Sequence, residues 1–315
     1  IEGGSLEFDA ASGKTQVIEY LKGNSGTLIL DNSGRSDQTL VLGFAQNHSA
    51  SDATFSGTVT LQGTNTKNTI KVSSGDGTSA DDYKNEQVLS GVISGGEVLV
   101  KDGFGILTLE GNNANTGGVE INNGTLKVGN SANDADLGTG TVTITKGKLE
   151  VGSGDTISNQ IQGGTVDSKK SMIGGDGTLS YTTGGGIVVG SASGEIDVIS
   201  PGAGISSSLS EVTGLSTQQV TLGGTSANDA MGNLTINKLT LNNGAVFDWE
   251  ITDFASGNNQ ATFNDNFDVL NFGSLVFGSG AVIDVNIFSV QSDGTAGAVD
   301  NIGTHSGDNG ILFLN

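Results

Sequence analysis

Acidic side chains are the residues of this sequence whose type and spacing come closest to chemistry. Asp248 and Glu250 stand two residues apart on a predicted strand and so share one face, and Asp134 and Asp136 have the same spacing within an insertion. Two carboxyl groups on one face are an arrangement used in glycoside hydrolysis. For both pairs we favour a solvated edge over catalysis. A lyase would also need basic side chains, and the only arginine, Arg35, has no basic neighbour.

A second acidic cluster has the oxygen atoms that a hard cation prefers. The stretch SGDGTSADDYKNE, residues 74–86, offers the carboxylates of Asp76, Asp81, Asp82 and Glu86 on a glycine-containing loop. Its spacing is not that of a twelve-residue EF-hand loop. We therefore expect no cofactor, with weak calcium binding at these four residues as the alternative to a solvated loop. His48 and His305 stand far apart without further ligands nearby, which argues against zinc.

The composition of the chain limits the fold classes that can position these residues. The chain has 315 residues with 52 Gly, one Pro, no Cys and a net charge of −21 at pH 7. Collagen is excluded because no Gly-X-Y period exists, and disorder is excluded because aliphatic residues recur regularly. The negative charge argues against nucleic acid and anionic membranes as partners. No apolar run approaches the ~18–20 residues of a membrane-spanning helix, so we expect no membrane insertion by this chain. Because residue 1 is Ile, we expect a processed or trimmed chain.

Short strands dominate the pattern. Alternating stretches such as TVTL at 58–61 and TVTI at 141–144 predict strands, and a recurring Gly, any residue, aliphatic unit predicts a turn before each one. The best helix candidate, residues 15–22, could equally be a strand. A unit of this kind cannot bury its apolar side alone, but stacked copies can, so we expect a β-solenoid. The alternative is a large antiparallel sandwich.

Residues 88–144 add a resemblance to a known family. The stretch combines KDGFG at 101–105, LTL at 107–109, GNN at 111–113, GTL at 124–126 and LGTGTV at 137–142. In these motifs it resembles the autotransporter-associated β-strand repeat of bacterial passenger domains. The resemblance implies an all-β, right-handed parallel β-helix exported to the outside of a bacterium. Two similar insertions interrupt the pattern, SANDAD at 131–136 and SANDAM at 226–231.

The C-terminal part differs in composition. Eight of the twelve Phe, together with Trp249, lie after residue 245, and no Lys or Arg follows Lys238. We therefore divide the chain into a solenoid of irregular repeats, residues 1–244, and more aromatic coils or a cap, residues 245–315. An uncharged final strand could pair with the start of another copy. The predicted assembly residues are Ile311, Leu312, Phe313 and Leu314 at one end and Ile1, Leu6 and Phe8 at the other.

These features predict a non-enzymatic, extracellular structural protein of a bacterial surface that assembles end to end into a filament or sheath. The expected partner is another copy of the chain. An adhesin or autotransporter passenger segment that binds a host or glycan ligand is the alternative, and residues 131–136 would be one of its displayed loops. A polysaccharide-active β-helix enzyme is less favoured, since no basic cluster accompanies the carboxylates.

Overall fold

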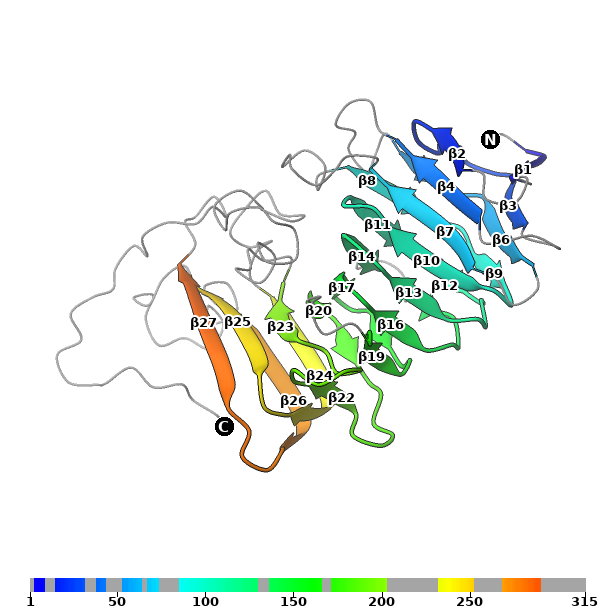
Figure 1. The fold of residues 1–315 in the computed structure, drawn as a ribbon. Coiled ribbons are helices and arrows are strands. Elements are labelled where there is room, and N and C mark those ends of the chain that lie inside the picture. Colours follow the sequence, from blue (N-terminus) through cyan, green and yellow to red (C-terminus); the bar gives the residue numbers. More distant parts are fainter. Residues whose placement is uncertain are drawn as a thin grey trace.

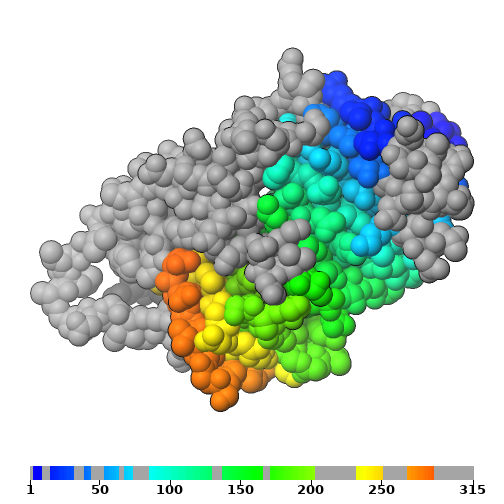
Figure 2. Space-filling model, in the orientation of Figure 1, coloured from blue at the N-terminus to red at the C-terminus, as the bar shows by residue number. Residues whose placement is uncertain are grey.

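The computed structural model describes ten segments of the chain, and these are built from strands, turns and bends. The segments are residues 3–8, 15–31, 38–43, 53–63, 67–73, 85–129, 136–165, 171–202, 232–251 and 268–289. They contain no helix, and therefore none that could cross a membrane. Figure 1 shows the strands stacked in chain order, and the same order runs along the surface in Figure 2.

Each coil of the stack passes through three sides, and each side is built from parallel strands. The first side begins with a four-stranded sheet of β1 (Ser5–Phe8), β3 (Thr27–Asp31), β6 (Thr58–Gln62) and β9 (Ile93–Gly95). The second is a seven-stranded sheet of β2 (Thr15–Ile18), β4 (Gln38–Leu42), β7 (Lys67–Val72), β10 (Val98–Asp102), β13 (Val119–Ile121), β16 (Val142–Ile144) and β19 (Ile161–Gly163).

The third side is a nine-stranded sheet that runs through most of the described chain. Its strands are β5 (Thr54–Phe55), β8 (Glu86–Leu89), β11 (Ile106–Leu109), β14 (Thr125–Val128), β17 (Gly147–Val151), β20 (Ser171–Gly175), β23 (Val198–Pro201), β25 (Ala245–Ile251) and β27 (Ile283–Ser289). This third sheet carries the charged residues Lys127, Lys148 and Glu150.

The coils change shape toward the C-terminal end. The first side continues with short strands, β12 (Asn112–Asn113) paired with β15 (Asp136–Leu137), and β18 (Thr156–Ile157) paired with β21 (Thr178–Leu179). The long strand β24 (Asn233–Leu241) then pairs with β21 through Thr235 and with β22 (Ile187–Val189) through Leu239. Since β24 spans two sides, it and its neighbour β26 (Val269–Phe277) reduce the cross-section from three sides to two.

The core lies inside the coils and consists of aliphatic columns. In the third sheet, the register places Leu107 beside Leu126, Leu126 beside Leu149 and Leu149 beside Ile173. All four are at most 1% exposed. Each fully buried Leu or Ile side chain contributes about 1.5–3 kcal/mol relative to exposure, so the repeated column stabilises every coil.

The turn glycine of the recurring unit has a conformational reason. Gly124, which precedes Thr125 and Leu126, has a φ of +64°, and a Cβ atom there would lie 2.5 Å from the carbonyl oxygens of Gly103 and Gly105 in the coil below. Only glycine fits both the left-handed backbone and the close approach of two coils. The Gly-x-aliphatic pattern thus marks the corner where one coil rests on the previous one.

The predicted fold class is confirmed. The described strands pair in parallel, which excludes the antiparallel sandwich, and residues 15–18 of the helix candidate form strand β2. Strands β25 and β27 extend the third sheet past residue 245 in the same direction. The domain division at that residue and the aromatic cap stay predictions. Of the assembly residues, Leu6 is exposed and Phe8 half-buried in β1; Ile1 and residues 311–314 lie outside the described segments.

Candidate functional site

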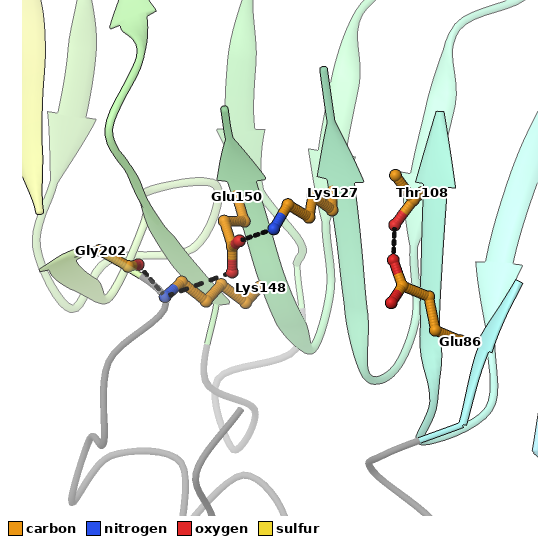
Figure 3. Close-up of polar contacts among 6 residues, drawn as sticks. All are labelled: Glu86, Thr108, Lys127, Lys148, Glu150 and Gly202. Carbon is orange, nitrogen blue, oxygen red and sulfur yellow. Dashed lines mark hydrogen bonds and ion pairs between the residues drawn. The ribbon is translucent and has the colours of Figure 1, made fainter. Parts of the chain in front are cut away.

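The side chains on the outer face of the third sheet form a buried polar column. The register aligns Thr108 with Lys127, Lys127 with Glu150, and Glu150 with Gly174. Lys148 is two residues before Glu150 on β17 and so shares its face. This face points away from the aliphatic core, yet Lys148 is 0% and Glu150 5% exposed. Figure 3 shows Lys127 from one strand and Lys148 from the next, both directed toward the carboxyl group of Glu150.

Glu150 lies between two lysines. Its Oε1 is 3.1 Å from Nζ of Lys127, and its Oε2 is 3.9 Å from Nζ of Lys148. The charge of Glu150 raises the pKa of Lys127 above its ordinary value, against the opposing effect of burial. Nζ of Lys148 also donates to the carbonyl oxygen of Gly202 at 2.5 Å. The contacts of Glu150 with Lys127 and of Lys148 with Gly202 join different coils, so the column fastens coils together.

Gly174 makes room for the buried lysine. A Cβ atom at this position would lie 2.0 Å from the carbonyl oxygen of Ser200, 2.6 Å from Cε of Lys148 and 2.9 Å from Nζ of Lys148. A side chain at Gly174 would therefore displace the ammonium group from Gly202 and Glu150. The glycine is thus required both by the close approach of β23 and by the buried side chain of Lys148.

Of the four predicted calcium residues, only Glu86 lies in the described segments. Glu86 lies in β8, where its Oε1 accepts a hydrogen bond of 2.5 Å from Oγ1 of Thr108 in β11. Asp76, Asp81 and Asp82 fall outside the described segments. Within those segments, no group of three or more His, Cys, Asp or Glu residues has an arrangement that could hold a metal ion. Calcium binding therefore stays a prediction, and so does the absence of a cofactor.

The carboxylate pair on β25 corrects one expectation. Asp248 and Glu250 share a face as predicted, but both are 0% exposed, so the solvated edge was wrong. A third carboxylate, Asp268 just before β26, is 3% exposed and accepts a hydrogen bond of 2.8 Å from the backbone N–H of Glu250. Of the other predicted pair, Asp136 begins β15 and Asp134 lies outside the described residues. Arg35, His48 and His305 also lie outside them.

Lys101 is a further buried charge that the sequence did not reveal. Its register partners in the second sheet are Ile70 and Ile121, two core residues, so its side chain starts on the inner face. Its ammonium group donates to the carbonyl oxygens of Asp102 at 2.9 Å, Gly103 at 2.7 Å and Asn123 at 2.9 Å. Burial lowers the pKa of Lys101 to about 7, and the charge of Asp102 opposes that shift.

These contacts indicate what the polar groups do. Lys101 bonds its own turn and the next one, Lys127 and Glu150 join neighbouring strands, and Asp268 joins separate segments. These contacts attach one part of the stack to another, which is how stacked coils are stabilised. The described chain is a parallel β-helix of the repeat-built class.

Comparison with known proteins agrees with this class. Residues 99–128 match the family described as the passenger-associated-transport repeat, so the chain carries an autotransporter passenger repeat in this segment. The match begins at Leu99 in β10 and ends at Val128 in β14, and it includes Lys101 and Gly124. No curated protein and no solved structure matches the chain significantly.

Proposed function

We propose that this chain is a non-enzymatic structural segment of a protein exported to the bacterial surface, where its β-helix forms a stiff rod. The passenger repeat at residues 99–128 supports export, since it is described as associated with transported passengers. The observation that carries the structural role is the burial of Lys101, Lys148 and Glu150, whose charged groups bond to other coils. A charged group that is buried and bonded to another coil is not available to contact a substrate.

Surface exposure is tested with intact bacteria that produce the protein with an epitope inserted at Gly154, a described turn glycine with open space around it. We expect antibody to label the cells and external protease to remove the label. Labelling that appears only after the cells are lysed would contradict export to the surface.

The non-enzymatic character is tested separately. The purified chain is incubated with a panel of polyuronides and neutral glycans, with and without calcium, and the products are followed by reducing ends and by absorbance of unsaturated sugars. We expect no cleavage. Cleavage that is lost in Glu150→Gln would overturn the proposal and identify the polar column as catalytic.

End-to-end assembly is a second candidate, and the N-terminal edge favours it. Strands β1 and β2 are the outermost strands of their sheets, and Leu6 is 38% and Val17 65% exposed. An apolar edge strand is a template for another strand. In electron micrographs of concentrated protein we expect filaments, and we expect Leu6→Lys or deletion of residues 311–315 to abolish them while the β-rich circular dichroism spectrum stays unchanged. Only single rods in the unmodified protein would refute assembly.

Binding of a host cell or glycan is the remaining alternative for the exported protein. It is tested by cell-binding and glycan-array measurements with the folded chain. Saturable binding without filaments would favour an adhesin over a structural rod.

A further inference from the structure

Three carboxyl groups are buried together near the C-terminal end of the described solenoid. Asp248 and Glu250 lie on β25, and Asp268 lies just before β26; their exposed fractions are 0%, 0% and 3%. Several ionised carboxylates in such a place repel one another and lose their hydration, so a carboxyl group without compensating donors takes up a proton.

Asp268 has donors that suit the ionised form. The backbone N–H of Gly232 donates to Oδ1 at 2.8 Å, and the backbone N–H of Glu250 donates to Oδ2 at 2.8 Å. The backbone of Asp268 is held too, since its N–H donates to the carbonyl oxygen of Glu250 at 3.0 Å and its own carbonyl oxygen accepts from Nε1 of Trp249 at 2.7 Å. Asp268 therefore connects the start of β24, the end of β25 and the start of β26.

Glu250 has no comparable set of donors. In the described part of the chain, both of its side-chain oxygen atoms are fully buried and accept no hydrogen bond. An ionised Glu250 would thus be a buried charge without a donor. A protonated Glu250 can instead donate its O–H to the Asp268 carboxylate beside it, which satisfies both groups.

We propose that Glu250 and Asp268 hold one proton between them at neutral pH, and that this shared proton fastens the last described coils to the solenoid. Its loss leaves two adjacent buried anions at the point where β24, β25 and β26 meet. Among the described residues, the other charged groups that act on the pair are Asp248 on the same strand and Lys148 on β17. Asp248 adds repulsion, and Lys148 reduces it.

The pKa shifts agree with this geometry. Burial, followed by the charge and side-chain hydrogen bond of Asp268, raises the pKa of Glu250 well above its ordinary value. Burial also raises the pKa of Asp268 to about 7, against the hydrogen bonds from Glu250 and Gly232. A carboxyl group with a raised pKa in the folded state contributes stability that is complete below its unfolded pKa and is lost as the pH rises through its folded pKa. The last coils should therefore loosen as the pH rises from about 4 through about 7 and beyond.

Trp249 is the only tryptophan of the chain, and its hydrogen bond to Asp268 makes it a local reporter. The experiment uses the full 315-residue chain and compares the unmodified protein with Glu250→Gln. The glutamine amide can still donate to Asp268, but it cannot release a proton. Glu120→Gln is the matched control, because Glu120 pairs with Lys67 on the second sheet at 2.8 Å, away from the buried carboxyl groups.

Two measurements test the proposal. At neutral pH, infrared spectra of the unmodified protein and of Glu120→Gln should contain the carbonyl band of a protonated carboxylic acid, and Glu250→Gln should lose it. Tryptophan emission should change with a transition near or above neutral pH in the first two proteins and stay flat in Glu250→Gln. Absence of the infrared band from the unmodified protein, or the same emission titration in all three, would overturn the proposal. Should Glu250→Gln fail to fold, the infrared band and its pH titration in the unmodified protein still decide it.

Discussion

Replacing Lys101 with methionine tests whether an interior ammonium group clamps successive turns of the passenger repeat. The two side chains have similar length, so the core around the aliphatic stem is retained while three donors are removed. The carbonyl oxygens of Asp102, Gly103 and Asn123 then lose their partner. Asn123 belongs to the following coil, so the substitution should weaken the contact between coils.

The magnitude follows from the three hydrogen bonds. The contact with Gly103 is buried, and an unsatisfied buried acceptor costs about 1–3 kcal/mol. The contacts with Asp102 and Asn123 are part-buried, so water partly replaces them and each loss costs about 0.5–1.5 kcal/mol. Removing a buried charge returns some of this free energy. We expect Lys101→Met to lower the free energy of unfolding by about 2–4 kcal/mol.

The stability difference between the unmodified protein and Lys101→Met should also depend on pH. Burial lowers the pKa of Lys101 from 10.5 to about 7, so between these values the folded protein binds fewer protons than the unfolded protein. The stability of the unmodified protein should therefore rise across this window, whereas Lys101→Met lacks that rise. The difference between the two proteins should widen with increasing pH.

The assay combines denaturant unfolding, followed by circular dichroism, with amide hydrogen exchange. The N–H of Asn122 donates to the carbonyl oxygen of Lys101 at 2.8 Å and reports on this turn. Lys67→Met is the control; it removes a partly exposed ion pair with Glu120 and should cost at most about 1 kcal/mol. Equal stability of Lys101→Met and the unmodified protein at all pH values, with unchanged exchange at Asn122, would refute the clamp.

Three further substitutions, one of them with a matched control, test other contacts between coils. Gly124→Ala should cost about 3 kcal/mol or more, because it adds a 2.5 Å clash to a positive φ, whereas Gly154→Ala, at φ +85° in open space, should cost about 1–2 kcal/mol; denaturant midpoints distinguish them. Gln87→Leu leaves the buried N–H of Leu21 without its 2.8 Å acceptor and should cost about 1–3 kcal/mol, with faster exchange of that amide. Glu150→Gln leaves the ammonium group of Lys148 buried beside a neutral partner and should lower the melting temperature by several degrees, a loss of about 2–4 kcal/mol. An unchanged melting temperature would show that the column is not needed for stability.

The inner face of the solenoid could be predicted from the sequence because it follows a simple rule. Alternation placed Leu107, Leu126 and Leu149 inside, and the glycine before Thr125 marked a corner. Both signals are local, since a strand has a period of two and a left-handed turn favours glycine.

The outer face of the third sheet could not be predicted in the same way. The alternation that places Phe247 and Trp249 on one face of β25 implies a wet face for Asp248 and Glu250, yet both are buried. Parallel sheets are commonly covered on both faces, and the pattern of one strand does not show whether its polar face is covered. Asp268 is 18 residues from Glu250 along the chain, and only the folded path brings the two together.

The sequence around Lys101 gives two conflicting indications of the side on which its side chain lies. It is two residues after Leu99, so strict alternation places it inside, whereas a charged residue in a strand is normally assigned to the solvent side. The three carbonyl oxygens that resolve the conflict belong to turns whose geometry depends on glycine. The position could therefore be assigned only with the turns in place.

The two buried charge sites give opposite pH dependences to two parts of one molecule. The turn held by Lys101 gains stability as the pH rises from about 7 toward 10.5, while the coils held by Glu250 and Asp268 lose stability as it rises through about 7. In a solenoid each coil contacts mainly its neighbours, so these effects should remain local. Alkaline pH should then raise the protection of the Asn122 amide, measured relative to its intrinsic exchange rate, while it changes the emission of Trp249. If both reporters changed over the same pH range and in the same direction, the coils would be coupled along the whole stack. Each site would then stabilise the whole rod rather than only its own turn.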